Sequence, residues 1–164
     1  MPDADVERPL TAKDDSSEAT IRQPRQADLP DLLELFRHLS PEDPEPDPAR
    51  AALAWSRLLG SDLATVFVAE HRKRLVASCT LVVLPNLTRN ARSIGWIENV
   101  VTHREHRRQG LGTRLLAAAL EAAWAADCYK VMLATGSGEE GTLCFYREAG
   151  FKQGGKTFFE ARRP

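Results

Sequence analysis

The hydrophobic positions of this chain change their spacing several times, and each change predicts a new element. A short β-branched stretch predicts a first strand over residues 19–23. Apolar residues three and four positions apart predict a helix over 28–38, with Asp28 as its N-cap. Asp47 and Pro48 suit the N-cap and first position of a second helix that ends near Gly60. Between the helices, four prolines within residues 41–48 exclude helix and sheet and indicate an extended loop.

The middle of the chain alternates with the period of β-strands. Residues 64–69 and 75–83 flank the polar turn 72–74, which predicts an antiparallel hairpin, and residues 94–102 supply a third strand. A helix is expected over residues 110–126. Because this helix is apolar nearly all round, we expect it to be buried.

The last third of the chain predicts a strand, a helix and a closing strand. Residues 129–133 have the composition of a core strand. Ser137 and Glu140 match a capping box at the start of a helix, and Gly150 suits its C-terminal end. A closing strand or hairpin is expected from residue 151 onward. The full order predicts an α/β (α+β) fold with a mixed sheet and helices on both faces.

The formal net charge of −1 conceals an uneven distribution. Residues 1–18 carry six acidic and two basic side chains, and residues 41–48 carry four acidic and no basic ones. We expect residues 1–18 to form a disordered acidic tail and residues 19–164 to form the folded domain. The remainder of the chain is left at about +7, which suits an anionic ligand. The basic residues are neither clustered on one helix nor interleaved with aromatic residues, so nucleic acid is not an expected partner.

Several classes of protein are excluded by composition. No apolar run approaches the ~20 residues that a membrane helix needs, so no membrane partner is expected. The acidic first residues lack the apolar core of a signal peptide. Three widely spaced cysteines match neither a disulfide framework nor a zinc pattern, which favours free thiols and a cytoplasmic location. They are Cys79, Cys128 and Cys144.

A basic turn with two glycines lies between the strand at 97–101 and the following helix. The glycines let backbone N–H groups approach an anion, and the first turn of the helix leaves its own N–H groups free. A Rossmann fingerprint would need a third glycine, and a P-loop would need Gly-Lys-Ser/Thr; both are absent. The turn therefore predicts a diphosphate site made of Arg107, Arg108, Gln109, Gly110, Leu111, Gly112 and Thr113.

The pattern Arg107-x-x-Gly110-x-Gly112, together with the aromatic helix at 145–151, resembles the GNAT N-acetyltransferase superfamily. The resemblance implies a GNAT-like mixed central sheet of six to seven strands flanked by about four helices. It implies acetyl-CoA as cosubstrate, with no metal, and pairing of the pantetheine arm with the backbone of Val100 and Val101. Homodimers are common in this superfamily, and the strand edge near the C-terminus is then a candidate interface.

Tyr146 is the candidate general acid. Attack of an amine on a thioester expels a thiolate, and a phenol with a pKa near ~10 can protonate it. By the resemblance, a tyrosine at this helical position commonly has that role. The alternative is that Tyr146 only packs against Phe145.

Glu98 is the candidate base. An amine with a pKa near ~10.4 is protonated at neutral pH, and a carboxylate beside the thioester can accept its proton directly or through water. The alternative is a surface acid on the polar face of the strand, or one that only orients the substrate.

Two other groups suggest chemistry less strongly. His103 and His106 flank Arg104 and Glu105, but their spacing is not that of a metal motif, so we expect a solvated charged turn. Cys144 has no histidine near it in sequence, so packing on the last helix explains it better than nucleophilic catalysis.

The acceptor is less clearly specified than the donor. Residues 97–151 resemble the glucosamine-6-phosphate N-acetyltransferase branch, but Asn99, Ala134 and Thr142 stand where that branch has other polar residues. Arg89 and Arg92 precede the Glu98 strand and are candidates to bind a carboxylate or phosphate of the substrate, along with Asn99. The alternative is that both arginines are solvated.

The sequence thus predicts an N-acetyltransferase that transfers acetyl from acetyl-CoA directly to a primary amine of a small molecule. Two other functions stay open. One is acetylation of peptide lysines, because the acidic loop over residues 41–48 would attract a basic peptide. The other is a CoA-binding regulatory domain without turnover, which the presence of both Tyr146 and Glu98 disfavours.

Overall fold

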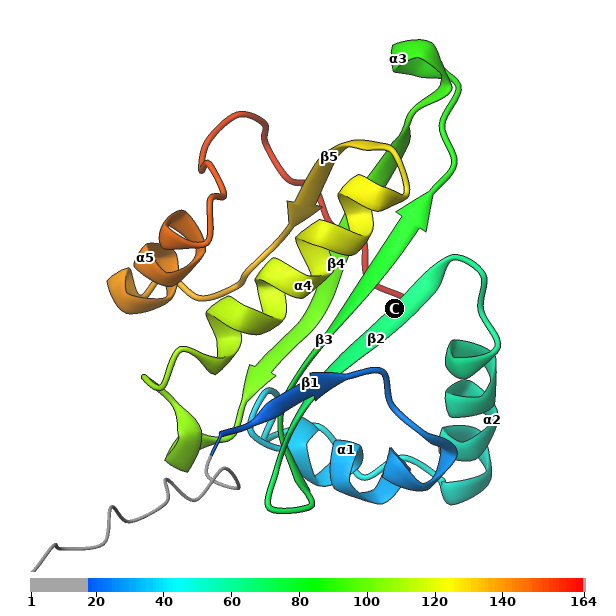
Figure 1. Cartoon of the computed structure of the whole chain (residues 1–164), viewed down its shortest axis with the longest axis vertical. Helices are drawn as coiled ribbons and strands as arrows, with labels where there is room; N and C mark the ends of the chain where they lie inside the picture. The colour runs from blue at the N-terminus through cyan, green and yellow to red at the C-terminus, as the bar shows by residue number, and fades with distance from the viewer. Residues whose placement is uncertain (1–17, 164) are drawn as a thin grey trace, which may run out of the picture.

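A central five-stranded sheet organises the chain in the computed structural model, which describes residues 18–163 (Figure 1). The expected acidic tail at residues 1–18 lies outside these residues except for Glu18. The strands lie side by side in sequence order, and all neighbours are antiparallel except the parallel pair β4 and β5. Their bounds are β1 Thr20–Arg22, β2 Ala64–His71, β3 Arg74–Leu84, β4 Ser93–Thr102 and β5 Cys128–Leu133.

Helices cover both faces of the sheet, as the sequence predicts. The long helix α4 packs across one face, while α1 and α2 lie against the other (Figure 1). No helix within residues 18–163 is both long and apolar enough to cross a bilayer. The bounds are α1 Leu29–Phe36, α2 Pro48–Leu59, α3 Thr88–Ala91, α4 Leu111–Ala125 and α5 Glu140–Glu148, with short 3₁₀ turns η1 Gln26–Asp28 and η2 Arg104–His106.

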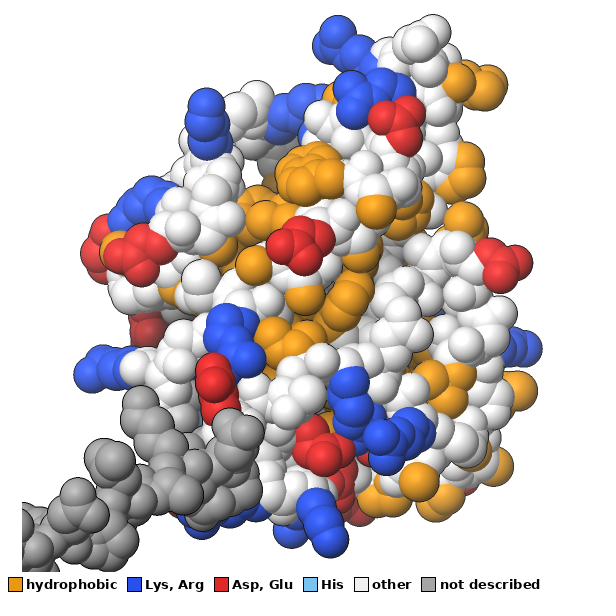
Figure 2. All heavy atoms as spheres, in the orientation of Figure 1, with side chains coloured by type: hydrophobic (Ala, Val, Ile, Leu, Met, Phe, Trp, Pro, Cys, Tyr) orange, Lys and Arg blue, Asp and Glu red, His pale blue; other side chains and the backbone are white. Residues whose placement is uncertain are grey.

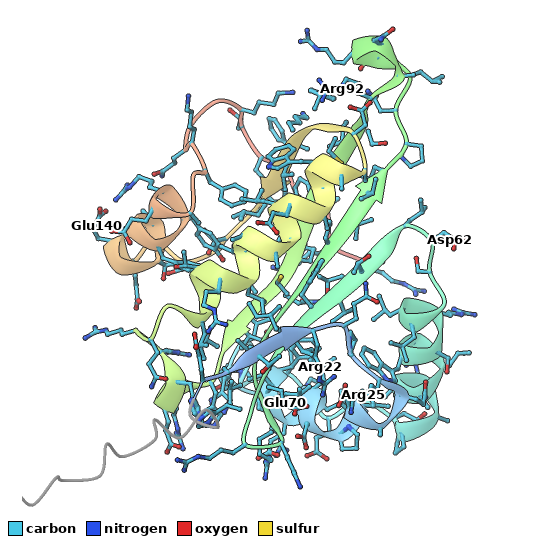
Figure 3. The ribbon with its side chains drawn as sticks, viewed as in Figure 1. Arg22, Arg25, Asp62, Glu70, Arg92 and Glu140 are labelled. Carbon is cyan, nitrogen blue, oxygen red and sulfur yellow. The ribbon has the colours of Figure 1, made fainter. Side chains whose placement is uncertain are left out.

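Two predicted helix starts have different outcomes. Asp47 caps α2, accepting a hydrogen bond from the backbone N–H of Arg50 at 2.9 Å, as expected. Asp28 does not cap α1 with its side chain. Its carboxylate instead accepts from the backbone N–H of Arg25 at 2.6 Å and forms an ion pair with Arg22, which lowers the pKa of Asp28. Arg22 also pairs with Glu70 and thereby ties β1 to β2 (Figure 3).

The expected count of six to seven strands is wrong for the described residues, because no closing strand follows α5. Residues 151–163 contain Gly154 and Gly155, which weaken a strand by their conformational freedom. Phe158 and Phe159 remain 61% and 88% exposed, so this segment buries little apolar surface that would hold it against the sheet. The outer edge of β5 therefore has no strand partner within residues 18–163.

Two further expectations about helices need correction. Helix α4 is buried along one stripe only, and Trp124 near its end is 51% exposed. The prediction that its apolar composition would bury the whole helix is therefore wrong. Hydrophobic side chains remain visible along α4 in Figure 2. Helix α5 has Glu139 rather than Ser137 as its N-cap. The Ser137 hydroxyl lies just before the helix and accepts from the backbone N–H of Glu139 at 3.2 Å.

Strand β4 carries the two irregularities that position the site. Near its middle, two residues of β4 face only Cys79 of β3, which is a β-bulge, and Asn99 has a left-handed φ of 53° there. Beyond the pair Ile97 and Leu133, β4 continues to Thr102 with no further partner on β5. The two parallel strands therefore separate directly before Glu98.

Candidate active site

The predicted diphosphate turn adopts the geometry that an anion site needs. Gly110 is the N-cap of α4, with a φ of 74°, and Arg108 has a φ of 60°. No side chain caps α4, so the N–H groups of its first turn, which includes Gly112 and Thr113, have no side-chain acceptor. An uncapped helix N-terminus with its positive dipole end exposed favours a phosphate group.

The side chains of the turn divide into those that brace it and those that face solvent. Arg107 donates from Nε to the carbonyl of Thr102 at 3.2 Å, and Gln109 donates to the carbonyl of Glu105 at 3.3 Å. Leu111 is buried under the turn. Arg108 is exposed and forms no ion pair within residues 18–163, so its charge is available to an anion.

The open edge of β4 lies next to this turn in sequence. Val100 packs against the core on the α4 side, whereas Val101 is buried on the α1 and α2 side. On one side, β3 pairs with this part of β4. On the other side, β5 has already separated, so the backbone of Val100 and Val101 lies along an unpaired edge. A peptide-like arm can add to such an edge as a strand does.

Glu98 is the first residue of β4 after the two strands separate. Its side chain is exposed, and its neighbour across β3 is Thr80. The indole N–H of Trp96 donates to the Glu98 carboxylate. No cation pairs with Glu98 among the described residues, so the carboxylate can accept a proton from a ligand.

Tyr146 lies half-buried on α5 between two other aromatic rings. Its ring centroid is 4.9 Å from that of Phe145 and 6.3 Å from that of Phe151. The backbone carbonyl of Tyr146 accepts from Phe151 at 3.0 Å, and Gly150 has a φ of 92°. This hydrogen bond and the left-handed φ of the glycine are those of a Schellman motif, which confirms that the helix ends at Gly150. Burial raises the pKa of Tyr146, and Cys79 and the charge of Glu98 raise it further.

A cavity of about 1060 Å³ lies between β5, α4, α5 and the segment after α5. Trp96 and Tyr146 both line it. Its other aromatic side chains are Trp124, Phe151, Phe158 and Phe159, and its charged side chains are all basic: Lys130, Arg147, Lys152 and Lys156. Sequence reasoning missed this cavity, because its walls come from four separate elements. One sequence signal was available: because side chains alternate along a strand, Trp96 and Glu98 share a face when Ile97 between them points into the core.

The two candidate arginines lie at the far end of β4. Arg92 directly precedes β4 and pairs with Asp127 at 2.8 Å (Figure 3). Arg89 is exposed on α3. Glu98 lies six positions along the strand from Arg92, a distance of about 20 Å. Asn99, by contrast, lies in the bulge directly beside Glu98.

All four histidines of the chain form one cluster, which we call the histidine cluster: His38, His71, His103 and His106. Ring centroids are 4.2 Å apart for His38 and His103, and 5.1 Å apart for His71 and His106. The expected solvated turn is therefore half-buried at its histidines. Between residues 18 and 163, no group of three or more histidine, cysteine or acidic side chains has the geometry of a metal site.

The cysteines are unpaired, as expected. Cys79 and Cys128 are buried, and burial raises the pKa of Cys79 to about 12. Cys144 lies on α5, where its thiol donates to Glu148 at 3.5 Å. This contact with the next turn of the same helix fits a packing role for Cys144.

The described residues thus combine an open strand edge with an uncapped helix N-terminus, and Glu98 lies where the strands separate. The model of the acetyltransferase (GNAT) family matches residues 29–151. The chain belongs to this family, and its enzyme class is N-acetyltransferase. It is 33% identical over 132 residues to the glucosamine 6-phosphate N-acetyltransferase of Trypanosoma brucei brucei, covering 80% of this chain and 88% of the relative.

Solved structures show the same fold. A protein of Agrobacterium tumefaciens that is assigned to the acetyltransferases is 42% identical, with a TM-score of 0.83 over 88% of this chain and 99% of its own. An aminoglycoside N-acetyltransferase in complex with CoA has a TM-score of 0.75 over 93% of this chain and 100% of its own. Its identity of 18% supports a shared fold alone.

Proposed function

We propose that this protein transfers acetyl from acetyl-CoA directly to a primary amine of a small molecule that also carries an anionic group. The observation that carries the proposal is the position of Glu98 and Tyr146. Glu98 stands where β4 and β5 separate and accepts a hydrogen bond from Trp96, and Tyr146 lines the same cavity as Trp96.

The chain offers acetyl-CoA two kinds of contact. The unpaired backbone of Val100 and Val101 would bind the pantetheine arm, and the free N–H groups at the start of α4, with Arg108, would bind the pyrophosphate. A Cβ at Gly112 would stand 3.0 Å from Phe145, so this glycine lets α5 pack closely against the start of α4. When bound, acetyl-CoA supplies an acetyl group that is already activated as a thioester.

The two side chains divide the proton transfers. Glu98 accepts the proton that the substrate ammonium must lose before its nitrogen can attack. As the new C–N bond forms and the C–S bond breaks, Tyr146 gives its phenolic proton to the departing sulfur. The second proton that the nitrogen loses on becoming an amide restores the phenol. The phenol carries its proton at neutral pH, and burial, which raises the pKa of Tyr146, makes it a weaker acid than an exposed phenol.

The charge of the cavity favours an anionic acceptor. Its four charged side chains are basic, and aromatic rings line the rest, which suits a small ring that carries a phosphate or carboxylate. Glucosamine 6-phosphate, named for the trypanosome relative, has this chemistry. A polycationic aminoglycoside does not, since it would meet like charge at Lys130, Lys152 and Lys156.

Acceptor-dependent release of free thiol from acetyl-CoA tests the function. The panel compares glucosamine 6-phosphate with glucosamine, which differ only in the phosphate, and adds an aminoglycoside, amino acids and a lysine peptide. We expect kcat/KM at least about tenfold higher for an anionic amine than for its uncharged analogue. Preference for the lysine peptide would instead support peptide acetylation. Binding of CoA with no turnover for any acceptor would overturn the enzymatic proposal.

A further inference from the structure

Trp96 and Glu98 lie on one face of β4. Side chains alternate along a strand, and Ile97 between them points into the core, where it is 1% exposed. Trp96 and Glu98 therefore project together from the opposite face. The indole N–H of Trp96 donates directly to Oε1 of Glu98.

Strand pairing holds Trp96 more firmly than Glu98. Trp96 lies between Val82 of β3 and Met132 of β5, which face it across both sides of the strand. Glu98 has a neighbour on β3 only, because β5 has separated from β4 at that level. A carboxylate on three rotatable bonds beside an open edge loses its orientation unless a fixed group binds it.

Within residues 18–163, the indole is the one side chain that donates a hydrogen bond to Glu98, and no Lys, Arg or His forms an ion pair with it. An indole N–H has no net charge, so it can orient the carboxylate without neutralising it. A lysine or arginine at the same place would weaken the carboxylate as a proton acceptor.

We propose that Trp96 is the positioning residue for Glu98: its indole N–H turns the carboxylate toward the acceptor amine at the point where β4 and β5 separate. This inference rests on the proposed role of Glu98 as base. The ring of Trp96 also lines the large cavity, so the same side chain joins the acceptor space to the proton acceptor.

The hydrogen bond is tested first in the free enzyme by NMR of the indole N–H groups. The chain has three tryptophans, and each predicts a different response. Trp55 donates to the carbonyl of Gln26 at 3.2 Å and should not respond to pH, and Trp124 is exposed and has no acceptor in the described part of the chain. We expect the Trp96 resonance, identified by its loss in Trp96→Phe, to titrate with pH. In Glu98→Gln that titration should disappear.

Kinetics then test the positioning role. Trp96→Phe keeps an aromatic ring but lacks the N–H, and we expect kcat to fall about tenfold. The acidic limb of the kcat/KM profile should move to higher pH, because the lost hydrogen bond favoured the charged carboxylate, with KM for acetyl-CoA unchanged.

The outcomes separate this inference from the proposed function. A Trp96 resonance that does not titrate, or one that titrates equally in Glu98→Gln, overturns the inference. A wild-type pH profile in Trp96→Phe, with Glu98→Gln inactive, also overturns it but leaves Glu98 as the base. Full activity in Glu98→Gln removes the base role itself, and the positioning role with it.

Discussion

At the scale of single residues, Asn99 shows how one backbone conformation builds an opening. Its left-handed φ of 53° lies in the β4 bulge, where two residues oppose one on β3. Asparagine tolerates this conformation better than most residues. The bulge shifts the alternation by one residue, so that Val100 rather than Val101 shares the α4 face with Ile97, while Val101 packs on the opposite side of the sheet.

Tyr146 gives the prediction at this scale. Tyr146→Phe should lower kcat by about 10²- to 10⁴-fold while KM for acetyl-CoA stays within about twofold, because only the acidic proton is lost. The pKa of Tyr146 is raised, so the phenol keeps its proton to higher pH, and the alkaline loss of kcat should lie above pH ~10. Steady-state kinetics across pH measure both effects.

Tyr129 provides the matched control, because it is the only other tyrosine of the chain and does not line the cavity. Its ring lies under the ammonium of Lys130, 5.4 Å from the ring centroid. Tyr129→Phe should retain kcat. Unchanged kcat in Tyr146→Phe would assign the proton transfer to another group.

At the scale of elements, the contact between α4 and α5 couples the diphosphate turn to the phenol. Gly112 in the first turn of α4 lies against Phe145 of α5, the residue next to Tyr146. A Cβ at Gly112 would stand 3.0 Å from Cζ and 3.1 Å from Cε2 of Phe145. The missing side chain therefore sets how closely α5 approaches the start of α4.

Gly112→Ala should displace Phe145 and cost about 1–3 kcal/mol of stability, as overpacking does. We expect a lower melting temperature, a higher KM for acetyl-CoA and a lower kcat together, since turn and phenol move as a unit. Thermal unfolding and calorimetric titration with CoA measure these effects. The double variant with Phe145→Leu makes room for the methyl group and should recover stability.

Gly110 is the control for this prediction. Its φ is 74°, but no atom lies within 4 Å of the place where a Cβ would stand. Gly110→Asn should therefore lower the stability only slightly, because asparagine accepts this conformation and no neighbour must move. An equal loss of stability in Gly112→Ala and Gly110→Asn would argue against close packing as the role of Gly112.

At the scale of the whole molecule, the histidine cluster joins three segments at one end of the sheet, beside the diphosphate turn. Burial lowers the pKa of His38 and of His106, and neighbouring imidazoles lower both further. Arg104 and Arg107 also disfavour a charge on His38, while Glu34 and Glu105 favour charges on His38 and His106 respectively. Among these histidines, Nδ1 of His103 accepts from the backbone N–H of Glu105 at 3.3 Å.

The cluster predicts loss of stability in acid. A histidine whose pKa is lower in the folded than in the unfolded state stabilises the fold above the unfolded pKa near ~6.5, and this contribution is lost as the pH falls through the folded value. The melting temperature should therefore drop from pH 7 to pH 5. The double variant His38→Asn/His106→Gln should show a shallower drop in differential scanning fluorimetry. An unchanged slope would assign the acid sensitivity to other groups.

The sequence predicted the features that depend on local rules. Asp47 capped its helix, Gly110 opened α4, and Gly150 ended α5, because each acts through neighbouring backbone groups. The prediction of a closing strand was wrong, since aromatic residues such as Phe158 form a strand only where a neighbouring surface buries them. The histidine cluster and the cavity could not be predicted, because segments far apart in sequence meet there only in the folded chain.

The burial of the cysteines gives the chain a practical property. Cys79 and Cys128 lie in the core, whereas Cys144 lies partly accessible on α5, two residues before Tyr146. Thiol-reactive dyes modify accessible cysteines before buried ones. The natural sequence therefore offers one preferred attachment point for a fluorophore, on the helix that carries the phenol and without any engineered residue.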